Sequence, residues 1–377
     1  MMMTRFTPAP FGLPSDRGGK DLGVFLPIAN GGWILSKNKP EMDGSYAYNR
    51  KTALLAEAAE LDFIMAMAKY RGYGGATHHW DCTLDSMLTI AALAEATSRV
   101  KIWGTIHTLL QNPAVAAKMV ATLDQISEGR AGLNVVTGSY REEFAQMGAW
   151  PDSVGHDERY DLATDWVRAI KALWTDHSVT MKSRYFTLED CRSDPKPAAR
   201  PFLICAGTST KGVQFAAQEM DAIFLSGGDP RELALAAQQA RDAATRQGRH
   251  IRTYSMMTVV PGETDEEAQA ACARYRDGLD EQALLGMMRA YGFLDSEIGR
   301  ENDFVKKSRS SFMTAHVHGS PATLLGKLSD LLDRSGTDGL MLIFPDYITD
   351  LPIFGAEVLP ALREGFSGRK PDAVCGP

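Results

Sequence analysis

Residues 112–140 read N-P-A-V-A-A-K-M-V-A-T-L-D-Q-I-S-E-G-R-A-G-L-N-V-V-T-G-S-Y, and this stretch predicts one helix followed by one strand. Asn112 suits the N-cap and Pro113 the first helical position, where its missing N–H costs nothing. Residues 127–129 end the helix, and the apolar run at 131–137 is typical of a strand buried on both faces. Apolar residues at helical spacing predict the buried stripe of the helix, namely Val115, Met119, Leu123 and Ile126.

An asparagine stands inside this predicted buried strand. The amide of Asn134 needs hydrogen-bond partners there, because an unpaired buried amide would cost roughly 1–3 kcal/mol. A bound ligand could supply them. Asn134 is therefore a candidate site residue.

The alternation of strand and helix continues on both sides of this unit. Seven further apolar runs predict strands at residues 22–27, 62–67, 100–105, 202–206, 221–225, 253–260 and 339–344. Further helices are predicted at residues 48–61, 83–97, 156–174, 230–246, 265–277, 321–334 and 353–363, with one more starting near residue 208. Eight alternating units predict an α/β fold, a (β/α)8 TIM barrel with right-handed crossovers. An open doubly wound sheet is the alternative.

The segments outside this rhythm set the domain organisation. Residues 1–21 are rich in proline, glycine and charge, and they predict an extended N-terminal arm. Residues 22–366 are predicted to form a single barrel, and residues 367–377 a C-terminal tail. The rhythm breaks down at residues 279–318, which we interpret as an insertion of irregular helices.

Composition limits the possible partners. The 377 residues carry a net charge of −7 with both signs interspersed, which argues against a nucleic-acid partner. The five cysteines are widely spaced and include no C-x-x-C pair, so a reducing compartment fits. No apolar run approaches the ~18 residues of a membrane span, and the N-terminus lacks the apolar core of a secretory signal. These features predict a cytoplasmic protein without a membrane partner.

Candidate functional residues are found where the predicted strands end, because active sites of such barrels lie at the C-terminal strand ends. The turn at residues 206–209, A-G-T-S, is typical of a phosphate cradle, since free N–H groups and the helix dipole both favour an anion. An ordinary turn with an N-cap is the alternative. The other strand-end candidates are Ala68, Lys69, residues 105–108 and residues 134–140.

Three residues beyond the fourth strand complete the candidate set. Glu143 follows that strand closely enough to reach the barrel mouth. Arg159 and Tyr160 offer a cation and a hydroxyl to a phosphate, although helical periodicity places Tyr160 in the core.

The histidines do not predict a metal site. His78 and His79 are adjacent, so both cannot easily bind one metal, and no carboxylate partner accompanies them. His316 and His318 are interpreted as structural. His107 either faces the pocket as a hydrogen-bond donor or packs among loops.

Four motifs taken together resemble the bacterial luciferase-like family of flavin monooxygenases. They are D-x-I-S-x-G-R at 124–130, N-V-V-T-G at 134–138, R-Y-D at 159–161 and C-A-G-x-S at 205–209. The resemblance covers nearly the whole chain. Within the family the chain is most similar to the pyrimidine monooxygenases, through G-V-F-x-P-I-x-N-x-G-W from Gly23, K-x-R-G-x-G-G from Lys69 and D-C-R from Asp190.

The resemblance implies a barrel that binds FMN, which a separate NAD(P)H-dependent flavin reductase supplies in reduced form. Reaction with O2 is then implied to give a flavin peroxide, at N5 or C4a, that opens a pyrimidine-like ring beside its nitrogen. Thr105 and Asn134 are the implied catalytic residues, and a homo-oligomer, a dimer or tetramer, is implied as well. The implied flavin-binding residues are Ala68, Lys69, Asn134, Glu143, Arg159, Tyr160 and Ser209.

Two segments depart from the pyrimidine group. Ser139 stands where those enzymes have tryptophan, and the loop at residues 70–79 carries different side chains. Both segments border the substrate side, so riboflavin, a sulfone or sulfonate, or another heterocycle are alternative substrates. A flavin-binding protein without catalysis is a third alternative, against which the presence of Thr105 and Asn134 argues.

Overall fold

The computed structural model describes residues 19–207, 209–292 and 309–367. Within these residues, parallel strands pair in the order β9-β11-β1-β2-β3-β4-β7-β8, and β8 pairs back onto β9 to close the ring. The predicted (β/α)8 TIM barrel is therefore confirmed, and the open doubly wound sheet is wrong. The strands are β1 (Asp21–Phe25), β2 (Phe63–Met65), β3 (Lys101–His107), β4 (Ala131–Val136), β7 (Phe202–Ala206), β8 (Ala222–Leu225), β9 (Arg252–Pro261) and β11 (Gly339–Ile343).

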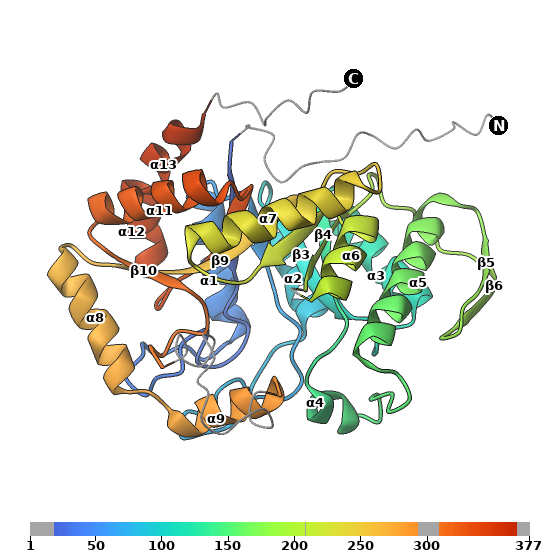
Figure 1. Ribbon diagram of the computed structural model, residues 1–377, viewed down its shortest axis with the longest axis horizontal. Coiled ribbons are helices and arrows are strands. Elements are labelled where there is room, and N and C mark those ends of the chain that lie inside the picture. The colour runs from blue at the N-terminus through green and yellow to red at the C-terminus, as the bar shows by residue number, and fades with distance from the viewer. Residues whose placement is uncertain (1–18, 208, 293–308, 368–377) are drawn as a thin grey trace.

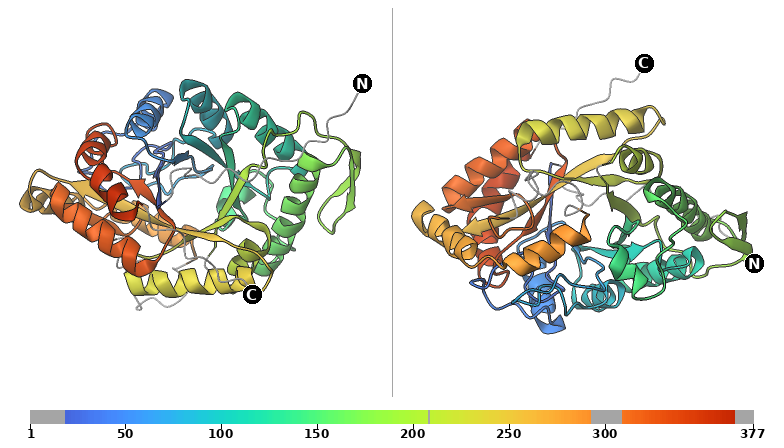
Figure 2. Two further views of the ribbon diagram at one scale, coloured as in Figure 1. Left: turned by 90° about the horizontal axis from the view of Figure 1, so that it is seen from above. Right: turned by 60° about the horizontal axis from the view of Figure 1, so that its bottom comes forward.

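Helices surround the strands, as the views of Figures 1 and 2 show. They are α1 (Tyr46–Ala58), α2 (Ser86–Ala96), α3 (Pro113–Ile126), α4 (Arg141–Ala145), α5 (His156–Thr175), α6 (Thr210–Glu219), α7 (Pro230–Thr245), α8 (Asp265–Asp277), α9 (Glu281–Ala290), α11 (Pro321–Ser335), α12 (Asp350–Glu357) and α13 (Leu359–Phe366). The helix predicted at residues 353–363 is wrong as one element. It divides at Val358, two residues before Pro360, which has no N–H to continue the helical hydrogen bonds.

Helix α3 starts as the sequence predicts but buries a different face. The Asn112 side chain accepts a hydrogen bond from the N–H of Ala114 at 2.9 Å. The predicted apolar stripe is correct for Leu123, which is buried, and for Met119, which packs against the core, but wrong for Val115 and Ile126, which are 51% and 42% exposed. Small side chains on the buried face let neighbouring elements approach closely, and the Trp174 indole of α5 donates to the carbonyl of Ala117. The buried apolar residues of α3 are Ala116, Ala117, Val120, Ala121 and Leu123.

The segment predicted as irregular helices contains a strand. Helix α9 lies within it, residues 293–308 fall outside the described part, and β10 (His316–Gly319) pairs in parallel with the end of β9. The prediction is therefore wrong for residues 316–318. Strand β9 continues past the residues that pair with β8, so its backbone groups there are available to β10. The predicted arm and tail lie outside the described residues, except for residues 19–21 and Ser367.

A second addition is an antiparallel hairpin of β5 (Val179–Lys182) and β6 (Thr187–Cys191), seen beside α5 in Figure 1.

Aromatic side chains fill the interior of the barrel. The rings of Phe63 and Trp103 stack with centroids 4.0 Å apart, and Phe202 stacks on Trp103 at 5.0 Å. Gly132 is required on β4, because a Cβ atom there would lie 2.3 Å from the Trp103 ring. This packed interior leaves the C-terminal strand ends as the place for polar side chains.

Candidate active site

Strand alternation places Thr105 on the interior face of the barrel. Gly104 faces outward, because an added Cβ would lie 2.5 Å from the Met87 sulfur of α2. Trp103 and Thr105 therefore share the inward face. Asn134 is the register partner of Thr105 on β4, and these two polar residues are 3% and 5% exposed.

A chain of hydrogen bonds sets the orientation of the Asn134 amide. Thr105 Oγ1 donates to the carbonyl of Ala66 at 2.6 Å, so it can only accept from Asn134 Nδ2, which lies 3.1 Å away. The Asn134 Oδ1 atom is thereby presented as an acceptor. It is buried and has no partner among the described residues.

His107 provides a second acceptor at the end of β3. Its Nε2 lies 3.1 Å from the carbonyl of Ala68 and must carry the proton, since a carbonyl only accepts. Burial lowers the pKa of His107, which keeps the ring neutral. Its Nδ1 atom is buried without a described partner. The sequence left open whether His107 faces the pocket or packs among loops. In the structure its ring packs edge-on against the ring of Phe144, with the two centroids 4.9 Å apart.

A buried ion pair joins the loop after β2 to α4. Lys69 Nζ lies 2.9 Å from Glu143 Oε2, and Glu143 Oε1 accepts from the N–H of Tyr70 at 2.6 Å. The ammonium also lies 5.0 Å from the ring centre of Tyr73 and 4.7 Å from that of Tyr140. Burial lowers the pKa of Lys69, and the charge of Glu143 opposes that shift. The pair and the two rings hold the ammonium in place.

The N-terminus of α6 lies beside the hydroxyl of Tyr160 on α5. Ser209 caps the helix and accepts from the N–H of Gly212 at 3.1 Å. Its side chain also hydrogen-bonds to Tyr160, whose pKa is raised by burial. A Cβ atom at Gly207 or Gly212 would lie 2.8 Å from the Tyr160 hydroxyl, so only glycine leaves that hydroxyl in place.

Arg159 lies beside Tyr160 on α5 and is mostly buried. Its guanidinium lies 4.8 Å from the ring centre of Trp150, and its Nε atom has no described partner. Burial lowers its pKa. Trp150 thus positions the Arg159 guanidinium, whose Nε–H donates no hydrogen bond to a described residue.

The predicted site residues gather around four neighbouring strands. Ala68 and Lys69 follow β2, Thr105 lies on β3, Asn134 on β4 with Glu143 after it, and Ser209 follows β7. These strands are adjacent in the barrel. The contacts fall into three groups: the Thr105–Asn134 pair, the Lys69–Glu143 pair, and Tyr160 with Ser209. Their roles toward a ligand stay predictions.

Sequence reasoning gave no role to an aromatic cluster on the loops after β1 and β2. The Trp33 ring lies 4.0 Å from Phe25 and edge-on to Trp80 at 5.0 Å. The Trp33 indole N–H is buried and has no described partner, whereas that of Trp80 donates to the carbonyl of Gly32. The signal available in the sequence was the density of aromatic residues in these two loops.

Comparison with known proteins places this geometry in a family. Residues 21–339 match the family model described as luciferase-like monooxygenase. The pyrimidine monooxygenase RutA of Methylorubrum extorquens is 36% identical over 353 residues, which cover 91% of this chain and 96% of that protein. Among solved structures, riboflavin lyase RcaE with modified FMN and riboflavin has a TM-score of 0.81 at 23% identity, with 92% of each chain covered. The long-chain alkane monooxygenase LadA has a TM-score of 0.81 at 21% identity and covers 92% and 91% of the two chains.

The chain belongs to the luciferase-like monooxygenase family. The prediction that it is an enzyme, a flavin-dependent monooxygenase, is confirmed by this membership.

Proposed function

We propose that this protein is a two-component monooxygenase that uses reduced FMN and O2 to open a pyrimidine-type ring, such as uracil or thymine, at a ring amide. Its similarity to RutA, a protein named pyrimidine monooxygenase, extends over nearly the full length of both chains and supports the substrate class. Riboflavin lyase, whose structure contains a modified FMN, shares the fold and supports the choice of FMN.

The observation that carries the proposal is the unpaired Asn134 Oδ1 atom. A buried acceptor without a partner is costly, and a ring N–H of a flavin would satisfy it. Thr105 fixes the amide in the orientation that presents this oxygen. Neutral His107 offers a second acceptor nearby in sequence on β3. These groups fit a flat heterocycle with polar edges.

The polar groups at the N-terminus of α6 fit the other end of FMN. Ser209, the Tyr160 hydroxyl and the N-terminus of α6 would bind a terminal monophosphate, because all three can donate hydrogen bonds and the helix dipole favours an anion. Arg159 would add a positive charge, and its unpaired Nε fits such a role. Reduced FMN bound there would supply the oxygen-activating chemistry.

The remaining residues of the site would bind, orient and exclude water. The aromatic interior beneath Thr105 closes the barrel to solvent from below. The Lys69–Glu143 pair would keep the loop after β2, beginning at Ala68, in place beside the flavin. Trp33 and Trp80 offer flat apolar surfaces on the loops that we assign to the substrate side.

A flavin reductase that uses NAD(P)H would supply the reduced FMN, and we also propose a cytoplasmic homo-oligomer, a dimer or tetramer. Exposed Leu88 of α2 and Val115 of α3 are large apolar residues on neighbouring helices, which suits contact with a second copy. No helix in the described part of the chain has both the length and the apolar character of a membrane span.

An anaerobic titration followed by oxygen tests the function. The protein is titrated with reduced FMN and with reduced FAD, and the complex is then mixed with O2 and uracil, thymine, riboflavin or dimethyl sulfone. We expect tighter binding of FMN than FAD and a ring-opened product from uracil or thymine that contains one atom from 18O2. Equal binding of FAD would refute the cofactor assignment. Product from riboflavin or the sulfone alone would refute the substrate and favour those alternatives.

A further inference from the structure

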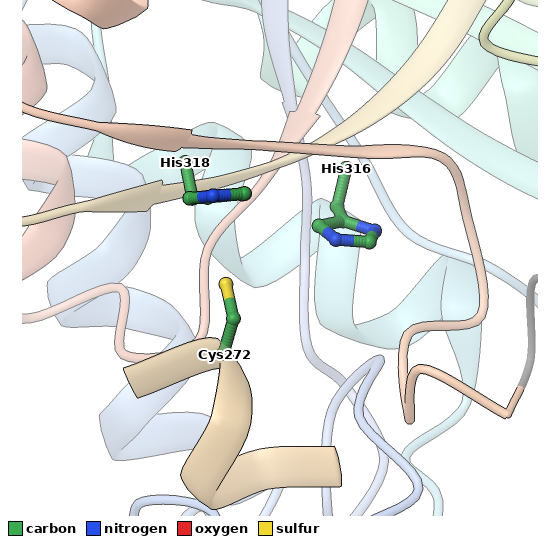
Figure 3. A group of neighbouring side chains, drawn as sticks. All are labelled: Cys272, His316 and His318. Carbon is green, nitrogen blue, oxygen red and sulfur yellow. The ribbon is translucent and has the colours of Figure 1, made fainter. Parts of the chain in front are cut away.

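Three side chains capable of binding a metal meet outside the barrel wall. Cys272 lies on α8, and His316 and His318 lie on β10. One ligand atom from each residue lies within 4.8 Å of the other two. Figure 3 shows both imidazoles on the same side of β10 and the Cys272 sulfur pointing from α8 toward them.

The fold explains why these residues converge. His316 and His318 are two residues apart on a strand, so their side chains leave the same face. The pairing of β10 with residues 258–261 of β9 fixes the position of the two histidines along β9, and α8 packs against β10. The cluster therefore rests on regular elements.

The residue types match a thiophilic metal ion. Zinc binds thiolate sulfur at about 2.3 Å and imidazole nitrogen at about 2.0–2.1 Å, and three protein ligands with one open position are a known arrangement. We propose that Cys272, His316 and His318 bind one Zn²⁺ ion, with a fourth position open to water. Tetrahedral ligands at these bond lengths lie about 3.3–3.6 Å apart. Small side-chain rotations would bring the three atoms from their present spacing to that distance.

Among the described residues, the three side chains have no hydrogen-bond partner that would compete with an ion. Neither the thiol nor the imidazoles form a hydrogen bond with another described side chain, and each residue is only partly buried, so an ion can reach them. The His316 ring does pack on Phe312 at 4.4 Å, but an apolar contact does not require a thiol and a second imidazole on the same face.

The two imidazoles are ready to bind a metal ion, whereas the cysteine must first lose its proton. Burial lowers the pKa of His316 to about 4 and also lowers that of His318, so both rings are neutral at pH 7. Burial raises the pKa of the Cys272 thiol to about 11. Cys272 would bind the ion as the thiolate, which is the form that coordinates a metal.

Nearby charges tune the affinity without adding a ligand. Lys327 donates to the carbonyl of His318 at 2.8 Å, and its positive charge opposes a bound cation, as does that of Arg276. The carboxylate of Asp265 favours a cation, but its two oxygens already accept from the N–H of Ser320 and the hydroxyl of Thr323.

This proposal departs from the expectation of no metal, which rested on local spacing. The cluster is separate from the proposed flavin site, because its ligands come from α8 and β10 and the flavin residues surround β2, β3, β4 and β7. The ion would tie α8 to β10, with water in its fourth position.

Cobalt titration of the chelator-treated protein tests the site. Co²⁺ should produce a thiolate-to-metal charge-transfer band and the strong visible absorption of tetrahedral cobalt, and one equivalent of Zn²⁺ should remove both. Cys272→Ser should abolish the charge-transfer band, and His316→Ala should weaken binding by at least ~10–100-fold, the loss typical even for an outer-shell change. Cys82→Ser and His250→Ala, at exposed positions away from the cluster, are the matched controls and should bind like wild type.

One further measurement on the wild type keeps the test independent of variant folding. Zn²⁺ should also raise the Tm of the wild type but not of Cys272→Ser. A charge-transfer band that persists in Cys272→Ser, a wild type without that band, or a Tm that does not respond to Zn²⁺ would each overturn the proposal.

Discussion

Removing the Thr105 hydroxyl should reduce turnover far more than it reduces FMN binding. Thr105→Val deletes the hydroxyl and preserves the branched shape of the side chain. The hydroxyl is buried, donates to Ala66 at 2.6 Å and accepts from Asn134 at 3.1 Å. Losing two such bonds should cost about 1–3 kcal/mol of stability, from about 0.5–1.5 kcal/mol each.

The effect on turnover follows from what the hydroxyl holds. Without it the Asn134 amide loses the contact that sets its orientation toward the flavin, and a hydroxyl that could rotate toward the reacting edge is lost as well. One preorganised hydrogen-bonding group is typically worth ~10²–10³ in rate. We therefore expect a loss of that size in kcat for Thr105→Val, whereas Asn134→Ala should reduce both FMN affinity and kcat.

Steady-state kinetics with saturating reduced FMN measure the effect, and fluorescence titration measures FMN affinity. Thr105→Ser is the matched control, because it keeps the hydroxyl and loses only a methyl group. It should retain most of the turnover. Unaltered turnover in Thr105→Val would remove this residue from the mechanism, and an equal loss in Thr105→Ser would assign the effect to packing.

Three further predictions concern other parts of the molecule. Gly207→Ala places a Cβ 2.8 Å from the Tyr160 hydroxyl, so FMN affinity should fall by roughly 10–100-fold, the equivalent of one hydrogen bond to a charged group, while riboflavin affinity stays the same. In fluorescence titrations, wild type that binds riboflavin as well as FMN would contradict the phosphate site. Lys69→Met leaves the Glu143 carboxylate buried and unpaired, which should cost roughly 3–5 kcal/mol in urea unfolding, and adding Glu143→Gln should recover much of the loss. A loss that the second substitution leaves unchanged would show that the charge is not the cause. Burial raises the pKa of Asp350 from 3.8 to about 7, so the wild type loses stability as the pH rises from about 4 to about 7. Asp350→Asn should gain an advantage that grows over this range and levels off above it at roughly 4 kcal/mol, from ~1.4 kcal/mol per pKa unit over about three units, and an advantage that does not vary with pH would refute the burial argument.

Local patterns predicted the elements of the barrel well. Helix α8 begins and ends where the sequence predicts it, and β7 does as well. A strand buried on both faces reads as a continuous apolar run, and a helix start carries its own N-cap, so each signal lies within a few consecutive residues. The Ser209 cap of α6 was predictable for the same reason, since it directly precedes the helix.

The inward face of α3 was not predictable from such patterns. Val115 and Ile126 match a helical stripe, yet both lie on the exposed side, because contact with α5 and the barrel selects the smaller alanines. Likewise β10 forms because β9 continues beyond the barrel, a fact about its neighbours.

The sequence by itself determined the eight strand-and-helix units of the barrel, which favour a closed barrel over an open sheet. Only the tertiary structure decided which side chains meet: Lys69 with Glu143, Thr105 with Asn134, and Cys272 with His316 and His318. Helical and strand periods are set by the backbone geometry of consecutive residues, so a single stretch of chain carries them. The hydrogen bond that the Thr105 hydroxyl donates depends instead on strands that are distant in sequence, and so does the contact between α8 and β10. Closure of the barrel brings these elements together, and no local stretch of sequence encodes their contacts.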